Sequence, residues 1–404
     1  MASRFRFDPP QMDVSSELAW ALSRAFGPVE KDSKTGDQLD AGEAIELADS
    51  LNLTARIGAR TPHSKLVDEL GEVGAGRVVE AHRRTAAHSL VVVQLCRELA
   101  RAGRELDIPT IFLKGAALLL VGRLPTGSRG MTDIDLLTLD REAPRFQQRM
   151  KDAGWAEKPG VPGEHQLRML THRSGLGLEV HTMVLGVRVS GAGSAGADDV
   201  LARSLAVPLP DPLAGSSVPT DSVLLAHLLV HGIAQHGLYP QSYPMSRLIA
   251  DAQDLCGNRE RWDELLPEAM AWIRSDVSIE EAEAVRDLAL RLGGGEDPAA
   301  IAEDNDRPAR LLRHILAGVF DKPYRDGLRL RSLARPLAGQ SASRTLFRNA
   351  FRTVWLTRPQ VEILYGTPRT SLGYWGWRFW RPFDLVLRAV RYGRAWVGDR
   401  LRRR

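Results

Sequence analysis

The chain has 404 residues, of which 44% are hydrophobic and 26% charged, and its formal net charge is +4. This composition is typical of a globular protein with two or three cores, and it excludes a chain that is disordered throughout. No apolar run approaches the roughly 20 residues of a membrane-spanning helix, and the first residues lack the apolar core of a secretory signal. The two cysteines exclude a disulfide framework and a Cys-based zinc module, so we expect a cytoplasmic protein.

The first hundred residues predict helices. Ser15 is a suitable N-cap for a helix that begins directly after it, and residues 36–49 carry apolar side chains at mixed spacings of three and four. Between Val78 and Leu106 the apolar side chains recur on one helical stripe, and charged residues occupy much of the remaining surface. We therefore expect an N-terminal helical region over residues 1–105.

The pattern then changes to short apolar runs separated by Gly and Pro, which is typical of alternating strands and helices. The order strand, helix, strand, helix, strand, strand is predicted over residues 107–115, 116–121, 133–139, 143–154, 165–172 and 177–184. A turn at Ser174 and Gly175 joins the last two strands. Residues 106–190 therefore predict the core of an α+β fold, a small mixed sheet with flanking helices.

The second half of the chain again predicts helices, after a segment rich in Gly, Ala, Ser and Pro. We expect this segment, residues 191–220, to be a linker. Helices are predicted over residues 222–232, 246–256, 262–274, 279–292 and 307–320. A C-terminal helical domain would thus cover residues 221–330, and residues 331–404 form a basic tail rich in Arg and Trp.

The residues that indicate chemistry lie in the α+β core. In a strand, Asp133 and Asp135 lie on the same face because side chains repeat with a period of two. Two neighbouring carboxylates repel each other unless a cation lies between them, and carboxylate oxygens suit Mg²⁺ or Mn²⁺. Glu179, on a later predicted strand, is a third candidate ligand, and three such carboxylates can hold two metal ions. Lys114 and Arg129 supply positive charge that phosphate oxygens would need.

These segments resemble a known family. The stretches IFLKG (111–115), GSRGMTDIDLL (127–137), GW (154–155) and LEVH (178–181) are similar to the uncharacterised bacterial nucleotidyltransferases of the DNA polymerase beta superfamily. The helical stretches LLAHLLVH (224–231) and RLIAD (247–251) resemble the continuation of that family. The resemblance covers roughly residues 80–290 and implies a nucleotidyltransferase-type sheet embedded between helical regions.

The resemblance also implies roles for individual residues. Gly115 matches the glycine at the start of a helix that holds the triphosphate, with Lys114 and Arg129 beside it. Asp133 and Asp135 match the metal-binding pair, and Glu179 matches the later acid, so these three are the expected catalytic and metal-binding residues. Two departures are Ala116, where the family pattern has Ser or Gly, and a longer gap from Gly115 to Asp133.

The expected function is a Mg²⁺- or Mn²⁺-dependent transfer of a nucleoside monophosphate from a nucleoside triphosphate, with ATP as the expected nucleotide, to an acceptor hydroxyl. Pyrophosphate would be released, and Glu179 would help to deprotonate the acceptor. The acceptor is a small molecule, a peptide or protein, or RNA. The alternative is an inactive protein of the same fold that binds a nucleotide or a peptide or protein partner, for which Ala116 is an argument.

Other interpretations of single residues stay open at this point. Glu179 can be an edge-strand charge in an ion pair, and Arg129 can brace its loop through a carboxylate. His181 shares the face of Glu179 and can orient a metal ligand or the acceptor, or be a solvated strand histidine. His227 and His231 share a helix face, but without a third ligand they favour packing over a zinc site.

The acidic pair on a predicted C-terminal helix and the basic tail also allow more than one interpretation. The pair Asp251 and Asp254, three apart on a predicted helix, is expected on a solvated face. The aromatic and Arg residues of the tail are expected to pack on the helical domain. Alternatively, they contact a membrane surface or an acidic partner, or stack on nucleic acid.

Overall fold

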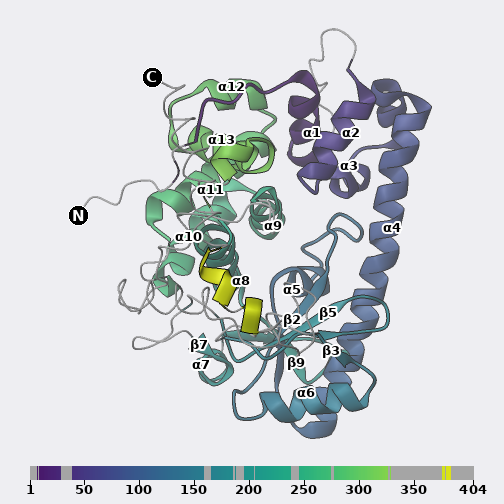
Figure 1. Cartoon of the computed structure of the whole chain (residues 1–404), viewed down its shortest axis with the longest axis vertical. Coiled ribbons are helices and arrows are strands. Elements are labelled where there is room, and N and C mark those ends of the chain that lie inside the picture. The colour runs from purple at the N-terminus through teal and green to yellow at the C-terminus, as the bar shows by residue number, and fades with distance from the viewer. Residues whose placement is uncertain are drawn as a thin grey trace.

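The structure is a computed structural model of the whole chain. It describes residues 7, 9–28, 39–158, 165–184, 187, 195–203, 205–237, 245–273, 277–325, 328, 375–377 and 379–383. Figure 1 shows an N-terminal group of helices, one long helix that leads from it to a sheet, and a second group of helices on the opposite side. No helix in the described ranges is long and apolar enough to cross a membrane.

The described part of the N-terminal region contains the helices α1 (Ser16–Phe26), α2 (Ala41–Ser50), α3 (Thr54–Arg60) and α4 (His63–Leu106). The predicted N-cap is present, because the Ser15 side chain accepts a hydrogen bond from the backbone N–H of Leu18. Trp20 and Phe26 of α1 and Ile57 of α3 are buried where these helices meet. The helical prediction for this region is therefore confirmed.

Helix α4 has 44 residues and runs from the N-terminal helices to the sheet (Figure 1). Gly71 interrupts it near the start with a φ of +69°, a conformation that glycine adopts without a steric penalty. Its C-terminal half packs on the sheet region through Val92, Leu95 and Leu99, all of which are buried. One helix therefore connects the two parts of the molecule.

Within the described residues, the main sheet has seven strands in the order β3-β4-β5-β2-β1-β9-β8. The strands are β1 (Thr110–Phe112), β2 (Asp133–Leu137), β3 (Ala156–Glu157), β4 (Leu170–Thr171), β5 (Gly177–His181), β8 (Ala206–Pro208) and β9 (Ser216–Pro219). A separate two-stranded sheet pairs β6 (Met183–Val184) with β7 (Ala195–Gly196), and a short helix α7 (Ala197–Ala202) follows. Helices α5 (Lys114–Leu120) and α6 (Ala143–Asp152) flank the main sheet. The α+β prediction with a mixed sheet is confirmed.

The segment expected as a linker, residues 191–220, differs from the prediction. It supplies β8 and β9, and β9 pairs in parallel with β1 inside the main sheet. The hydroxyl oxygen of Ser216 lies 2.6 Å from that of Thr110, and both side chains are buried. Because this contact is polar, β9 does not have the run of apolar residues from which a buried strand is predicted. The prediction of a strand over residues 165–172 was also too long, since only Leu170–Thr171 pairs as a strand.

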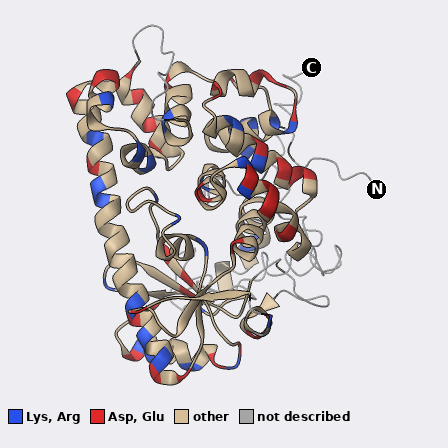
Figure 2. Cartoon of the chain, turned by 180° about the vertical axis from the view of Figure 1, so that it is seen from behind, with Lys and Arg blue, Asp and Glu red and all other residues tan. Residues whose placement is uncertain are grey.

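The C-terminal region is helical, as predicted. It comprises α8 (Asp221–Leu229), the π-helix η1 (Val230–Gln235), α9 (Ser246–Cys256), α10 (Arg259–Trp272), α11 (Ile279–Gly293), α12 (Pro298–Glu303) and α13 (Arg307–Phe320). Acidic and basic residues are interleaved on these helices (Figure 2), and Arg291, for example, pairs with three carboxylates. Most of the basic tail lies outside the described residues; of its described part, residues 375–377 and 379–383 are helical, with Trp375 and Phe379 exposed.

Candidate active site

The register of two parallel strands brings the predicted acids together. Strands β2 and β5 pair so that Asp135 lies opposite Glu179, and Asp133 lies opposite Gly177. Because side chains alternate along a strand, Asp133, Asp135 and Glu179 point to the same side of the sheet. The face is fixed by the buried neighbours Ile134 and Leu136, which point the other way into the core. The three carboxylates therefore gather on one face, as the period-two pattern predicts.

Lys114 lies directly against Asp135. The backbone N–H of Leu113 donates to the carbonyl oxygen of Asp135, which joins the end of β1 to β2 just before α5 begins. Lys114 then takes a φ of +50°, and its Nζ lies 2.6 Å from Oδ1 of Asp135. Burial opposes the charge of the ammonium, but Asp135, together with Glu179 and Asp133, outweighs it and holds the pKa of Lys114 above its usual value. Helix α5 thus starts two residues earlier than predicted, at Lys114 itself.

His181 is the third partner of Asp135. Its Nε2 donates a hydrogen bond of 2.8 Å to Oδ1 of Asp135 and lies 3.6 Å from Oε2 of Glu179. Although burial raises the pKa of Asp135, Lys114 and His181 together lower it well below the usual range. The solvated-histidine interpretation is wrong, because His181 is buried. Instead it is held between the two carboxylates.

One group of side chains in the described residues has the composition of a metal site. One ligand atom from each of Asp135, Glu179 and His181 lies within 4.8 Å of the others. Two carboxylates and an imidazole are a donor set that divalent ions such as Mn²⁺ accept, and the carboxylates alone suit Mg²⁺. The residues present therefore fit a divalent cation. The group contains two of the three predicted acids, Asp135 and Glu179, and its third member is His181 and not Asp133.

Asp133 lies at the edge of this group. It is half-buried, and its pKa is raised first by burial and then by the negative charge of Asp135. Lys114 and Arg129 act in the opposite direction and lower this pKa, so their charges reach the same carboxylate. The two cations predicted to bind phosphate therefore both lie within electrostatic range of Asp133.

Arg129 extends from the loop that connects α5 to β2 and lies across the start of α5. A Cβ added to Gly115 would come within 2.1 Å of its Nη1, so only glycine leaves room for the guanidinium there. Two histidines of α4 hold the loop: His82 Nδ1 donates to the carbonyl oxygen of Gly127 at 3.2 Å, and His88 Nε2 donates to that of Met131 at 2.7 Å. The loop is thereby tied to the long helix on both sides of Arg129.

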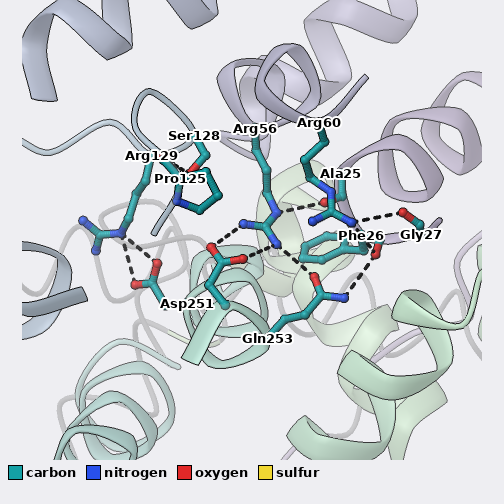
Figure 3. Close-up of polar contacts among 11 residues, drawn as sticks. Ala25, Phe26, Gly27, Arg56, Arg60, Pro125, Ser128, Arg129, Asp251 and Gln253 are labelled. Carbon is teal, nitrogen blue, oxygen red and sulfur yellow. Dashed lines mark hydrogen bonds and ion pairs between the residues drawn. The ribbon is translucent and has the colours of Figure 1, made fainter. Parts of the chain in front are cut away.

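A carboxylate of the C-terminal region completes the arrangement, and the sequence analysis missed it. Asp251 of α9 accepts from Nε of Arg129 at 2.8 Å and 3.1 Å, one distance for each oxygen (Figure 3). The expected solvated face for Asp251 and Asp254 is wrong, since Asp251 is 1% exposed and Asp254 pairs with the buried Arg56. The interpretation of Arg129 as a brace through a carboxylate is confirmed. The available signal in the sequence was that apolar residues such as Leu248 and Ala252 surround Asp251 on the predicted helix.

Several histidines also lie near Lys114. Burial and then the charge of this lysine lower the pKa of His227, His231 and His236, and the ring of His165 lies 5.4 Å from that of His181, centroid to centroid. The rings of His227 and His231 are 6.1 Å apart and both are buried, which agrees with packing against the core. Among the residues described, these helix histidines belong to no metal-ligand group. His227 and His231 instead pack in the core within electrostatic range of Lys114.

Comparison with known proteins gives the family. Residues 37–276, more than half of the chain, match a family model described as an uncharacterised nucleotidyltransferase. Neither a curated protein nor a solved structure matches the chain. The matched range contains Lys114, Asp135, Glu179 and His181, and it also includes Asp251. The chain therefore belongs to this uncharacterised nucleotidyltransferase family.

Proposed function

We propose that the protein is a metal-dependent nucleotidyltransferase that moves a nucleoside monophosphate from a nucleoside triphosphate to an acceptor hydroxyl and releases pyrophosphate. One observation carries this proposal. Adjacent parallel strands place Asp135 and Glu179 side by side, with His181 between them and Lys114 at 2.6 Å from Asp135, in a chain of a nucleotidyltransferase family. Catalysis of this type needs acids and cations side by side.

The triphosphate would lie beside Gly115, between the ammonium of Lys114 and the guanidinium of Arg129. Arg129 covers Gly115 so closely that a Cβ there would collide with it, and both cations influence Asp133. A planar guanidinium can hold two phosphate oxygens, and an ammonium can hold a third. ATP is the nucleotide that we propose.

Asp135, Glu179 and His181, with Asp133 beside them, would hold Mg²⁺ or Mn²⁺. A bound divalent ion would neutralise the charge that develops on the phosphate oxygens. The acceptor oxygen forms a bond to the α-phosphorus as the bond to the pyrophosphate oxygen breaks, and the acceptor proton passes to a carboxylate. We assign this proton to Asp133 in preference to Glu179, because burial and Asp135 raise the pKa of Asp133 toward the working pH.

The proposal covers three classes of acceptor: a small molecule, a peptide or protein, and RNA. It places the enzyme in the cytoplasm. A contact of the basic tail with a membrane surface or an acidic partner stays a prediction.

A second function is favoured by the ion pair of Lys114. Its ammonium already neutralises Asp135 at 2.6 Å, so the protein itself supplies a cation at the site. Together with Ala116, this supports a protein that binds a nucleotide or a peptide or protein partner without transferring a group.

Binding and turnover distinguish the two functions. The full-length protein is titrated with each of the four nucleoside triphosphates, with Mg²⁺, with Mn²⁺ and with a chelator, and pyrophosphate is then measured in the presence of acceptor pools of each class. We expect metal-dependent binding that Asp135→Asn weakens, followed by pyrophosphate release. Binding without release by any pool, or binding that needs no metal, would support the second function, and the absence of any triphosphate binding in the wild type would reject the transferase and the nucleotide-binding form of the second function.

A further inference from the structure

Helix α9 carries two buried carboxylates one turn apart, and each holds an arginine from a different part of the chain. Asp251 pairs with Arg129 of the loop before β2, and Asp254 pairs with Arg56 of α3. The side chains of Asp251 and Asp254 are 1% and 7% exposed. The two pairs have the same chemistry and the same helix, so they can be compared directly.

The two arginines face different surroundings. Arg56 donates from Nε to the carbonyl oxygen of Ala25 and from both Nη groups to the carboxylate of Asp254. Its Nη2 also donates to the side-chain oxygen of Gln253. All its donor nitrogens are therefore engaged in joining α3, α1 and α9 (Figure 3). Arg129 donates from Nε to Asp251, and its guanidinium lies over Gly115 at the start of α5.

The contact through Nε determines how the guanidinium of Arg129 is oriented. The group is planar, and a carboxylate that binds its Nε with both oxygens restricts rotation about the last bonds of the side chain. The Nη groups then stay at the start of α5, next to Lys114. Without Asp251, the side chain of Arg129 could rotate about its several bonds. It could then turn toward Asp133, a second carboxylate whose pKa it already lowers.

We propose that Asp251 is a positioning residue of the nucleotide site: the C-terminal helical region supplies a carboxylate that holds Arg129 over Gly115 in the orientation that receives the triphosphate. This inference rests on the proposed function, because it takes the phosphates to lie between Lys114 and Arg129. It makes α9, more than a hundred residues after Asp133 and Asp135, a working part of the site. Asp254 has no such role, since its arginine lies among α1, α3 and α9.

The test is a calorimetric titration of the full-length protein with α,β-methylene-ATP and Mg²⁺. Inorganic tripolyphosphate with Mg²⁺ serves as a second probe that carries no base. The variants are Asp251→Asn, its matched control Asp254→Asn, Arg129→Ala, and the double variant of Asp251→Asn with Arg129→Ala. Thermal unfolding of each variant tests whether it is folded at the titration temperature, and Glu replaces Asn at both positions if either Asn variant is not.

We expect Asp251→Asn to weaken the binding of both probes about tenfold, equivalent to about 1.4 kcal/mol. Asp254→Asn should bind like the wild type, and Asp251→Asn should have no further effect in the Arg129→Ala background, which is the signature of one shared interaction. Equal losses in Asp251→Asn and Asp254→Asn, or additive losses in the double variant, would overturn the inference while leaving the proposed function intact. A wild type that binds neither probe would overturn both.

Discussion

Asp133 and Asp135 are two residues apart on one strand, yet their electrostatic surroundings are opposite. Asp135 is buried between Lys114 and His181, which hold its pKa well below the usual range despite its burial. Asp133 lacks such close cationic contacts, so burial and the charge of Asp135 raise its pKa. At neutral pH the charge of Asp133 therefore opposes folding, whereas the charge of Asp135 compensates a buried cation.

This difference predicts stability changes of opposite sign. At pH 7 without metal, Asp133→Asn should raise the free energy of unfolding, on the order of 1 kcal/mol, the usual size of a single-residue effect. Asp135→Asn should lower it by about 3–5 kcal/mol, because it leaves Lys114 buried and unpaired. Urea denaturation of both variants measures the two effects. A loss of stability in Asp133→Asn would show that Asp133 is a structural ion-pair partner.

His236 predicts a dependence of stability on pH. Burial, followed by the charge of Lys114, lowers the pKa of His236 to about 4, whereas Glu179 and Asp135 act weakly in the other direction. The unfolded chain therefore takes up a proton near pH 6.5 that the folded protein refuses until about pH 4. Stability from this group is complete above pH 6.5 and is lost as the pH falls to 4, by at most about 3 kcal/mol.

The measurement for His236 compares pH profiles of unfolding. Urea denaturation of the wild type between pH 7 and pH 4 should show a steeper loss of stability than that of His236→Gln, which removes the titrating group. His231, whose ring lies edge-on at 4.4 Å from that of His236, and the buried His227 contribute in the same direction, so the variant should retain part of the slope. Identical profiles would mean that the ring of His236 is open to protons in the folded state.

At the scale of single elements, the loop between α5 and β2 depends on its fit to α4. Gly127 has a φ of +84°, and a Cβ there would lie 2.7 Å from Cε1 of His82. Gly122, in the same loop, has a φ of +70° but no atom within 4 Å of an added Cβ. The two glycines therefore share the backbone conformation and differ in the contact with α4.

Alanine substitutions separate these two effects. Gly122→Ala should lower the free energy of unfolding by about 1 kcal/mol, the cost of a left-handed conformation for a residue with a Cβ. Gly127→Ala should cost about 1–3 kcal/mol more, because His82 must also give way. It should also weaken triphosphate binding, since Arg129 lies two residues further along. Urea denaturation and the titrations above check this, and equal losses would show that the loop shifts freely on α4.

How far the sequence predicts these elements depends on the range of the interactions. The common face of Asp133 and Asp135 on β2 was predicted from the two-residue repeat of a strand, and the end of α6 was predicted from Gly154. Both signals are local in the sequence. The role of Asp251 was not, because its partner Arg129 lies 122 residues away and an isolated acidic residue on a helix reads as solvent-exposed. Strand β9 was missed for the same reason, since Ser216 becomes buried only when β1 pairs with it.

At the scale of the whole molecule, buried ion pairs on α9 join three parts of the chain. Arg56 of α3 and Arg129 of the core loop bind the same helix, and Gln253 of α9 also donates to the carbonyl oxygen of Phe26 at 3.1 Å (Figure 3). We therefore expect the N-terminal helices, the sheet and the C-terminal helices to unfold together.

Breaking the Arg56 pair tests this cooperativity. Asp254→Asn leaves a buried guanidinium without its carboxylate and should lower the free energy of unfolding by about 3–5 kcal/mol. The double variant Arg56→Met with Asp254→Leu should recover a large part of this loss, because apolar side chains of similar size need no charged partner. Calorimetry should show one transition in the wild type and in both variants. Two separate transitions would mean that α9 does not couple these regions.

The position of β9 in the sheet has a consequence for dividing the chain into fragments. The Gly-, Ala- and Ser-rich stretch near residue 190 invites truncation there, because the acids and Lys114 all precede it. Such a fragment would lose β9 and leave β1, with the buried Ile111, as an open edge available to other chains. We expect it to aggregate rather than fold. A fragment that retains the whole described sheet must extend at least to Pro219, although the sequence suggests an earlier boundary.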